Sequence, residues 1–302
     1  MPEPIEFAKL SGSGNDFICI DSRDGRFDSM LSDLKAAGHF ARSLCRRGLG
    51  VGGDGVIFAC RPEDDIEADI AARFLEADGS EAELCGNGAG AFVYWAYQNR
   101  WHEGPELRIL TPAGIVRGQD GQGPYVRVCI PLPEDVQRDR QIDVKGQRWT
   151  YDFAVTGVPH VVTYVDHLEC LDVAHWGAAF RHHSRFEPRG ANANFVQVLG
   201  TGRLAIRTFE FGVECETLAC GTGCAAAAIL ATLRFGWPEK YARGQEPVLL
   251  RTRSGDVLRV YLTLAADGAV SDLCLETIVR FAYQGTIHPQ LADVATHPPD
   301  CP

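Results

Sequence analysis

The sequence contains one short pattern twice, and this pattern decides how the chain is organised. The first copy reads Glu81-Ala-Glu-Leu-Cys85-Gly-Asn-Gly-Ala89, and the second reads Glu216-Thr-Leu-Ala-Cys220-Gly-Thr-Gly-Cys224. Both have the form Glu-x-x-x-Cys-Gly-[Asn/Thr]-Gly, and small residues that suit a helix follow each cysteine. The repeat predicts two similar lobes, each with one thiol at the start of a helix.

The length of the chain agrees with two lobes, because 302 residues exceed a single ordinary core and suit two domains of about 150 residues each. The turn-rich segment 118–125, GQDGQGPY, predicts a lobe boundary near residue 125. The first lobe carries Cys85 and the second carries Cys220. The three predicted parts are an N-terminal lobe, a C-terminal lobe and a frayed tail: 1–125 (completed by a C-terminal strand near 278–288), 126–277, and 289–302.

Short runs rich in β-formers outnumber the helical patterns, so we expect an α+β fold with mostly antiparallel strands. Four segments have apolar residues at the three-to-four spacing of a helix: 33–46, 86–99, 173–181 and 221–235. Nine segments have the composition of strands: 17–21, 56–59, 69–74, 126–130, 160–165, 194–198, 204–209, 257–261 and 278–281.

The composition indicates a folded protein that handles small molecules. Hydrophobic residues make up 45% and charged residues 23% of the chain, and the net charge of −11 argues against a nucleic-acid surface. The first residues, MPEPIEFAKL, lack a secretory pattern, and the apolar run 223–233 is too short to span a membrane. We therefore expect a cytoplasmic protein with no membrane or nucleic-acid partner. Eleven cysteines in such a chain favour free thiols over disulfides.

A cysteine at a helix N-terminus meets unpaired N–H groups and the positive end of the helix dipole. These lower the thiol pKa from about 8.5, so that the thiolate can act as a base. The backbone amides of Gly86, Asn87, Gly221 and Thr222 are placed to bind a carboxylate, and an amino-acid α-carboxylate fits that requirement.

Two thiols on opposite sides of one α-carbon would be arranged for inversion: one removes a proton while the other supplies one to the opposite face. Oriented amides and dipoles would stabilise the carbanion, so no cofactor is required.

Three other interpretations of the cysteines remain open. A Cys-Gly-x-Gly segment is usually a turn with a buried thiol, although two copies make that less plausible. A zinc site could use Cys215, Cys220 and Cys224, but their spacing lacks the Cys-x2-Cys pairs typical of zinc, so we expect no metal. A reversible disulfide between Cys85 and Cys220 would switch an enzyme off.

Further motifs occur in order along nearly the whole chain, and together they resemble the diaminopimelate epimerase family. These motifs are Lys9-Leu-Ser-Gly-Ser-Gly-Asn15-Asp16-Phe17, Gly50-Val-Gly-Gly-Asp54-Gly55, Ala77-Asp78-Gly79-Ser80-Glu81, both Cys-Gly-x-Gly elements, Gly157-Val-Pro159-His160, and Asn192 with Phe195. The resemblance implies two pseudo-symmetric lobes, each a mostly antiparallel sheet wrapped around a central helix. It also implies a pyridoxal-independent two-thiol mechanism that makes meso-diaminopimelate for lysine and peptidoglycan.

The resemblance assigns roles residue by residue. Cys85 and Cys220 match the base and acid, while Gly86, Asn87, Gly221 and Thr222 match the α-carboxylate binders. Asn15 and Asn192 match residues of the substrate pocket, and Glu210 and His160 match groups that contact the α-amino end or help the thiols. Asn15 could instead only shape its glycine turn, and His160 could be a structural histidine. A homodimer is compatible with this prediction, and the sequence does not fix the oligomeric state.

Two positions depart from the family pattern at the far end of the pocket. Glu76 stands where members commonly have asparagine, and Phe211 stands where they have an arginine that resembles a clamp for the distal carboxylate. A carboxylate beside Glu76 without a cationic partner would be disfavoured. The alternative is therefore a racemase of a basic amino acid such as lysine, ornithine, arginine or histidine. Another arginine could also restore the clamp, and Arg73, Arg207 and Arg251 are candidates.

Two further classes remain as alternatives. A proline racemase or dehydratase would use the same two-lobed fold, but elimination needs only one thiol, and this chain has both. A redox sensor or binding protein would lose no catalytic activity when Cys85 or Cys220 is alkylated.

Overall fold

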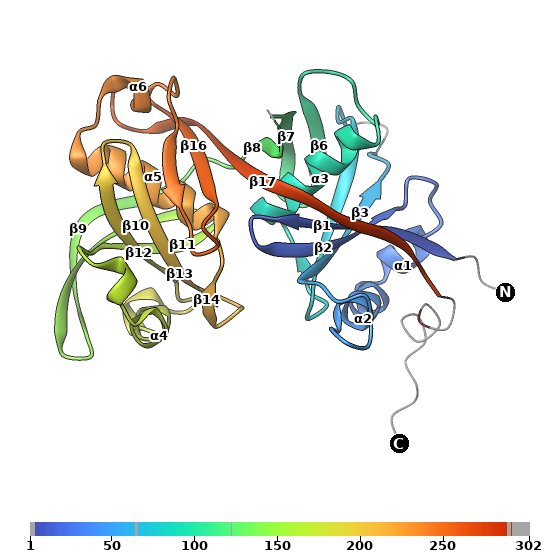
Figure 1. The fold of residues 1–302 in the computed structure, drawn as a ribbon, viewed down its shortest axis with the longest axis horizontal. Helices are drawn as coiled ribbons and strands as arrows, with labels where there is room; N and C mark the ends of the chain where they lie inside the picture. The colour runs from blue at the N-terminus through green and yellow to red at the C-terminus, as the bar shows by residue number, and fades with distance from the viewer. Residues whose placement is uncertain (1–3, 64–65, 122, 289–290, 292–302) are drawn as a thin grey trace. The chain divides into compact units, whose positions relative to one another are not determined.

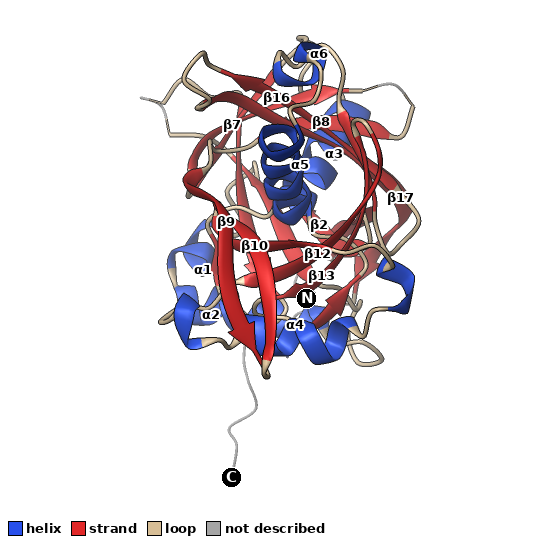
Figure 2. Cartoon of the chain, turned by 90° about the vertical axis from the view of Figure 1, so that its left-hand side faces the viewer, coloured by secondary structure: helices blue, strands red, loops and turns tan. Residues whose placement is uncertain are grey.

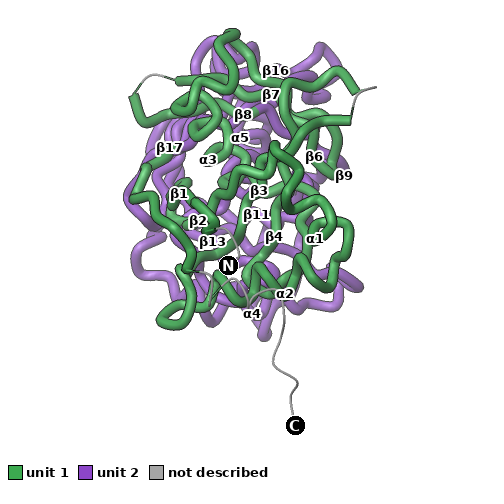
Figure 3. The backbone as a smooth tube through the Cα atoms, turned by 90° about the vertical axis from the view of Figure 1, so that its right-hand side faces the viewer, with its two compact units in different colours: residues 1–128, 278–302 green, residues 129–277 purple. Residues whose placement is uncertain are grey.

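The computed structural model describes residues 4–63, 66–121, 123–288 and 291. The chain divides into two compact units: residues 1–128 with 278–302, and residues 129–277 (Figure 3). The expected boundary at residue 125 thus lies three residues before the division between the units. The tail expected over 289–302 lies, apart from Leu291, outside the described residues.

Unit 1 contains two hairpin-forming strands, two outer helices and a central helix with its flanking strands (Figure 1). Its elements are β1 (Ile5–Gly12), β2 (Asn15–Asp21), α1 (Asp28–Ser32), α2 (Leu34–Cys45), β3 (Gly55–Cys60), β4 (Ile70–Glu76), β5 (Glu81–Ala82), α3 (Gly86–Gln98), β6 (Leu107–Thr111), β7 (Gly114–Asp120) and β8 (Tyr125–Cys129).

Unit 2 contains helices and strands in a similar order, with one more strand before its first helix and an additional short helix after its central one. Its elements are β9 (Glu134–Val144), β10 (Gln147–Thr156), β11 (Val158–Tyr164), α4 (Val173–Arg181), β12 (Asn192–Gly200), β13 (Arg203–Glu210), β14 (Cys215–Thr217), α5 (Gly221–Phe235), α6 (Glu239–Ala242), β15 (Val248–Arg251) and β16 (Val257–Leu264). The long strand β17 (Val270–Ile287) begins in unit 2 and continues into unit 1 from residue 278.

Strand pairing repeats between the units. In unit 1, two pairs of strands are parallel: β2 with β3, and β4 with β6. The other pairs are antiparallel: β3 with β4, β4 with β5, and β6 with β7. In unit 2, β11, β12, β13, β14, β15 and β16 pair in the corresponding directions. Each parallel step needs a crossover, which α2 and α3 supply in unit 1 and α4 and α5 in unit 2. The internal repeat predicted from the sequence is therefore a repeat of topology.

Each unit has a central helix that its sheet surrounds. In α5, the residues from Cys224 to Thr232 are all buried, and strands β9, β10, β11, β12, β15 and β16 contact the helix (Figure 2). Helix α3 is buried from Asn87 to Val93 and contacts β1, β2, β3 and β7. Such a helix can be apolar on all sides, which explains the alanine-rich sequence of α5.

A second hydrophobic layer lies on the other side of each sheet, under α2 or α4. Phe27, Phe40 and Phe58 form an aromatic cluster in unit 1, with ring centroids 5.6–6.1 Å apart. In unit 2, Trp149 contacts both Phe180 and Phe195 with centroid distances of 5.5 and 6.2 Å. A strand between two apolar layers is buried on both faces, so β3 reads as a continuous apolar run.

The four predicted helices are confirmed as α2, α3, α4 and α5, and the mostly antiparallel α+β fold is confirmed as well. Local signals fix their starts: Asp33 caps α2 by accepting from the Lys35 N–H, and Asp172 caps α4 by accepting from the His175 N–H. The nine predicted strands also form, but β1, β5, β6, β7, β9, β10, β14 and β15 were not predicted.

An arginine–glutamate pair occurs at the same place in both units. Arg73 on β4 makes a two-pronged ion pair with Glu81 at 2.6 and 2.9 Å, and Arg207 on β13 makes the same pair with Glu216 at 2.6 and 2.8 Å. Both arginines also donate to backbone carbonyls, that of Leu31 in unit 1 and those of Leu168 and Leu171 in unit 2. Because each glutamate begins the repeated pattern, each pair anchors the segment that leads to a cysteine.

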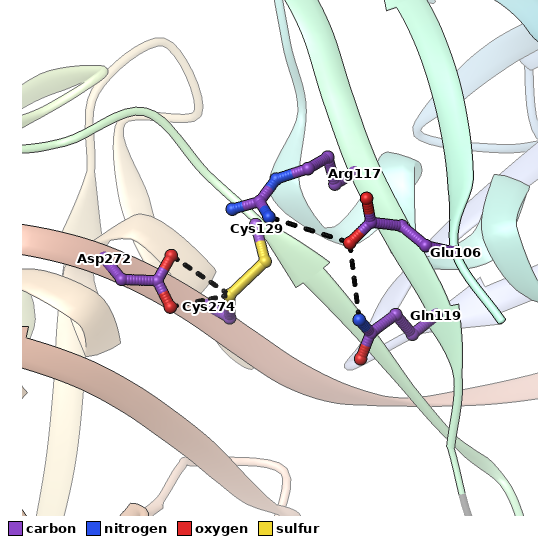
Figure 4. The surroundings of a disulfide bond; sticks show 6 residues. All are labelled: Glu106, Arg117, Gln119, Cys129, Asp272 and Cys274. Atoms are coloured by element: carbon purple, nitrogen blue, oxygen red, sulfur yellow. Dashed lines mark hydrogen bonds and ion pairs between the residues drawn. A yellow bond between two sulfur atoms is a disulfide. The ribbon is translucent and has the colours of Figure 1, made fainter. Parts of the chain in front are cut away.

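The expectation that all eleven cysteines are free thiols is wrong. Cys129 and Cys274 form a disulfide between strands β8 and β17, which pair with each other (Figure 4). The Asp272 carboxylate lies 3.9 Å from the Cys274 sulfur. This is a contact rather than a hydrogen bond, because a disulfide sulfur carries no proton. The spacing of two cysteines in a sequence contains no information on strand register, so this pair was not predictable.

No helix within the described residues is both long and apolar enough to cross a membrane.

We predict that Arg207→Met lowers the free energy of unfolding by about 2 kcal/mol, because it removes the two-pronged partner of the mostly buried Glu216 carboxylate and leaves only the half-exposed Arg253, at 3.5 Å. Arg251→Met is the matched control, since Arg251 is half exposed and lies 3.8 Å from Glu169. Its effect should stay below about 0.5 kcal/mol. Urea unfolding followed by circular dichroism measures both, and equal effects would contradict the anchoring role.

Candidate active site

Cys85 and Cys220 are the N-cap residues of α3 and α5, as predicted. Both have extended backbone angles, with φ −115° and ψ 114° at Cys85 and φ −126° and ψ 110° at Cys220. The Gly88 N–H donates to the Cys85 sulfur at 3.4 Å. A sulfur in this position takes the place of the oxygen that usually caps a helix, so the unpaired amides of the first turn point toward it.

The expectation that the helix N-terminus lowers the thiol pKa is wrong for Cys220. Burial raises the pKa of the Cys220 thiol well above its usual range, and the negative charge of Glu210 raises it further. Hydrogen bonds from the Thr222 hydroxyl and the Gly223 N–H act in the opposite direction but do not outweigh burial. At neutral pH, Cys220 is therefore a thiol.

Gly86 and Gly223, in the first turns of α3 and α5, lie in different surroundings. A Cβ on Gly86 would meet no heavy atom within 4 Å, so the backbone there is open to a ligand. A Cβ on Gly223 would lie 2.4 Å from the Asn194 carboxamide oxygen. Gly223 is thus required by a protein side chain.

In unit 1, the predicted residues Asn15 and Asn87 contact each other. The Asn15 side-chain N–H donates to the Asp54 carboxylate at 3.2 Å, which directs its carbonyl oxygen toward the Asn87 amide nitrogen at 2.7 Å. This orientation leaves the buried Asn87 Oδ1 with no hydrogen-bond partner among the described residues. A buried acceptor of this kind suits a donor from a ligand, such as an ammonium group.

In unit 2, His160 is completely buried and both of its ring nitrogens are hydrogen-bonded. Nδ1 lies 3.1 Å from the Asn194 amide nitrogen and Nε2 lies 3.0 Å from the Thr222 hydroxyl. Burial lowers the pKa of His160 to about 3, and the contact with Asn194 opposes this only in part. His160 is therefore neutral at physiological pH.

Glu210 ends β13 and its carboxylate accepts from the Thr217 hydroxyl at 2.7 Å. Its charge reaches both Cys220 and Cys224, and in both cases it raises the thiol pKa. Glu210 is thus close enough to Cys220 to affect its thiol, and its contact with the substrate stays a prediction.

Asn192 and Phe211 also lie together. The buried Asn192 accepts the Phe211 backbone N–H at 2.6 Å, and the Phe211 ring is 38% exposed. The guanidinium carbon of Arg181, from α4, lies 4.3 Å from the centre of that ring. Arg181 pairs with Glu214 at 3.1 Å, so a positive and a negative charge both lie next to Phe211.

The arginines considered as replacements for the missing clamp have other partners. Arg73 and Arg207 hold Glu81 and Glu216, and Arg251 lies nearest Glu169. Glu76 ends β4, where its backbone N–H donates to the Ser80 carbonyl at 2.8 Å. None of these three arginines is therefore available without breaking an existing ion pair.

Among the described residues, one group of His, Cys, Asp or Glu side chains is close enough to hold a metal ion: Cys129, Asp272 and Cys274. Two of its members form the disulfide and offer no thiolate. The set considered from the sequence, Cys215, Cys220 and Cys224, does not form such a group.

The predicted site residues fall into one group in each unit. The group in unit 1 contains Asn15, Glu76, Cys85, Gly86 and Asn87, and the group in unit 2 contains His160, Asn192, Glu210, Phe211, Cys220, Gly221 and Thr222. Asn15 contacts the first turn of α3 through Asn87, and His160 contacts the first turn of α5 through Thr222. The charge of Glu210 acts on Cys220. That the two groups face a common ligand stays a prediction.

A family model described as diaminopimelate epimerase matches residues 7–122 and 153–259. The chain belongs to the diaminopimelate epimerase family. The diaminopimelate epimerase of Aquifex aeolicus (strain VF5) is 40% identical over 258 residues, which cover 85% of this chain and 89% of that protein. The enzyme of the same name from Chlorobaculum tepidum is 34% identical over 287 residues, 92% of this chain and 99% of that protein.

Solved structures support the fold of this epimerase family member. A probable proline racemase from Agrobacterium radiobacter K84 has a TM-score of 0.70 at 16% identity and covers 97% of this chain and 95% of its own. A hydroxyproline epimerase from Agrobacterium vitis has a TM-score of 0.69 at 17% identity, covering 94% and 92%. These likenesses concern the fold alone. Membership in the family makes the protein an isomerase of the amino-acid epimerase type, which acts on a small molecule.

Sequence reasoning missed three residues that orient the predicted ones. Asp54 orients Asn15, while Asn194 and Thr208 are hydrogen-bonded to each other behind His160. One sequence signal could have identified Asn194: it lies two positions after the predicted site residue Asn192 in the mostly apolar strand β12. Side chains two apart on a strand face the same side, so both had to reach the same neighbourhood.

We predict that His160 makes stability depend on pH between about 3 and 6.5, the two pKa values of its folded and unfolded forms. In that window the unfolded chain binds a proton that the folded chain does not, so stability is lost as the pH falls, by up to about 1.4 kcal/mol per pH unit. Urea unfolding at several pH values should show a steeper loss for the wild type than for His160→Gln. Parallel curves would contradict a neutral buried His160.

Proposed function

We propose that this protein converts LL- to meso-diaminopimelate by inverting one α-carbon, with Cys85 and Cys220 as alternating base and acid. The observation that carries the proposal is the same N-cap cysteine at the start of the central helix in both units. Inversion needs two groups, because the proton leaves one face of the carbon and a different proton arrives on the other. One thiol from each half of the chain meets that requirement.

The backbone supplies the other part of the chemistry. The N–H groups at the starts of α3 and α5, at Gly86, Asn87, Gly221 and Thr222, bind the α-carboxylate and stabilise the charge that develops when the α-proton leaves. The unpartnered Asn87 Oδ1 accepts from the α-ammonium group. Closure of the two units around the α-carbon is part of this proposal, and so is a mechanism without a cofactor. The expected homodimer and cytoplasmic location stay predictions.

The names of the two relatives support diaminopimelate as substrate, and Arg181 does so too. Its guanidinium carbon lies 4.3 Å from the centre of the Phe211 ring and so brings a positive charge next to the position where family members have an arginine, although Arg181 is itself paired with Glu214. An anionic distal group is favoured near such a charge.

A second candidate is a racemase of a basic amino acid. Phe211 carries no charge, Glu76 adds a negative one, and Arg73 and Arg207 are paired with glutamates. These features favour a cationic side chain, whereas Arg181 disfavours it. Substrate measurements therefore have to compare diaminopimelate with lysine, ornithine, arginine and histidine.

We predict that Cys85→Ser and Cys220→Ser each lower the rate of inversion by about 10²–10⁴-fold, because each removes a group that transfers a proton. In D2O, each variant should still exchange the α-hydrogen of one stereoisomer without inversion, and the two variants should exchange opposite stereoisomers. Mass spectrometry and chiral chromatography measure both quantities. If both variants exchange the same stereoisomer, the two-face mechanism is wrong, and full activity in either variant refutes the proposed function.

We predict that Phe211→Arg raises the ratio of kcat/KM for diaminopimelate to that for lysine by at least about tenfold, since it adds a cation for the distal carboxylate. Phe211→Leu is the matched control, because it removes the ring without adding charge. A wild-type preference for lysine or another basic amino acid over diaminopimelate would establish the second candidate. An unchanged ratio in Phe211→Arg would show that residue 211 does not contact the distal group.

A further inference from the structure

A series of hydrogen bonds leads from the interior of unit 2 to the sulfur of Cys220. Thr208 Oγ1 donates to Asn194 Oδ1 at 3.0 Å, and Asn194 Nδ2 lies 3.1 Å from His160 Nδ1. His160 Nε2 lies 3.0 Å from Thr222 Oγ1, which lies 3.5 Å from Cys220 Sγ. The series connects three neighbouring strands, β11, β12 and β13, with the first turn of α5.

The orientation of the Asn194 amide sets the direction of the first step. Its Nδ2 lies 2.9 Å from the Val161 carbonyl oxygen, which can only accept, so the NH2 group must face that side. Its Oδ1 on the other side accepts from Thr208. The two hydrogens of the Asn194 NH2 group face three acceptors: the Val161 and Asn192 carbonyl oxygens at 2.9 and 3.3 Å and His160 Nδ1 at 3.1 Å. The NH2 group cannot accept, so a proton on Nδ1 would point at amide hydrogens; Nδ1 therefore carries no proton and is the acceptor of this contact.

The orientation of Asn194 determines which ring nitrogen of His160 carries the proton. His160 is neutral in its buried position and has a single ring proton, which must be on Nε2 because Nδ1 is an acceptor. The Nε2–H consequently donates to Thr222 Oγ1. The histidine cannot accept the hydrogen of the Thr222 hydroxyl.

The last step concerns the Thr222 hydroxyl, which has one hydrogen to donate. With His160 as its donor on one side, that hydrogen is directed to Cys220 Sγ on the other. The Thr156 hydroxyl donates to the Thr222 carbonyl at 2.9 Å and so holds the backbone of this residue in place. A donor aimed at a sulfur stabilises the thiolate relative to the thiol.

We propose that the Thr222 hydroxyl is a donor of fixed direction that stabilises the Cys220 thiolate, and that His160, Asn194 and Thr208 are positioning residues that set this direction. The use of that thiolate as a base rests on the proposed function. No proton moves along the series, so His160 does not act as an acid or a base. Its side chain keeps the Thr222 hydrogen pointed at the sulfur.

The charged and titratable groups around Cys220 show why such a donor matters. The Glu210 carboxylate at the end of β13 and the Cys224 thiol one turn along α5 both disfavour the thiolate, as burial does. The Thr222 hydroxyl and the Gly223 N–H favour it. Among the described residues that act on Cys220, Thr222 is the side chain whose removal makes the thiolate less accessible.

The test measures the thiolate directly in the full-length protein without substrate. Iodoacetamide alkylation of Cys220 is followed peptide by peptide between pH 7 and 10.5, since the rate is proportional to the thiolate fraction. Thr222→Val keeps the shape of the side chain and removes the donor. The Cys220 rate should fall about tenfold at a given pH, equivalent to a shift of about one pH unit.

Four further variants complete the experiment. Thr222→Ser restores the donor and should stay within about twofold of the wild type. Thr232→Val is the matched control, since Thr232 is a buried threonine of the same helix whose hydroxyl donates to the Ala228 carbonyl at 2.8 Å. His160→Gln should lower the rate in the same direction as Thr222→Val, and the double variant should alkylate no more slowly than Thr222→Val alone.

A Thr222→Val rate within twofold of the wild type overturns the proposal, and so does a His160→Gln effect of full size in the Thr222→Val background. A separate assay for α-hydrogen exchange distinguishes this failure from failure of the proposed function. If no amino acid exchanges but Thr222→Val slows alkylation, the hydrogen-bond series is supported and the epimerase function is wrong. If an amino acid does exchange its α-hydrogen but Thr222→Val leaves the alkylation rate unchanged, the epimerase function is supported and the hydrogen-bond series is wrong.

Discussion

The position of a cysteine sulfur at the first turn of a buried helix is the constraint on which both halves of the molecule depend. Such a sulfur lies in low-dielectric surroundings that favour the neutral thiol, and it also faces amide hydrogens that favour the thiolate. For Cys220 the first effect is larger. Three neighbouring groups adjust this balance. The Gly223 N–H and the Thr222 hydroxyl favour the thiolate, and the Glu210 carboxylate disfavours it. The arginine–glutamate pairs then hold the segment that delivers each cysteine.

Much of the fold could be predicted because its helices carry strong local signals. Asp33 and Asp172 are capping residues, and α5 is apolar on all sides from Cys224 to Ala231. The strands that escaped prediction have weaker patterns: β9 reads EDVQRDRQIDV and exposes most of its side chains, so no apolar alternation marks it. It is held by pairing with β10, which is information on distant residues that a local pattern does not contain.

The candidate site could be predicted as a list of residues but not as a network. The repeated cysteine pattern placed both thiols at helix starts, whereas the relation of Asn194 to His160 and Thr222 depends on the register of β11 against β12. The pKa of Cys220 was predicted in the wrong direction, because the sequence showed the helix but not the depth of burial. At the distal end, the sequence showed that an arginine is missing at position 211. It could not show that Arg181, from another element, packs against the phenylalanine found there.

Strand β17 has a consequence for how the protein is made. Its first part pairs with β16 from Arg259↔Glu276 to Leu264↔Val270, and its second part pairs with β1 from Gly12↔Val279 to Ile5↔Ile287. On the ribosome, β1 is synthesised long before its partner, since the elements from β2 to β16 lie between them. The edge of β1 that β17 covers therefore stays open until β17 is made, and an open edge can pair with other chains. A circular permutant that begins at β17 would close the sheet early.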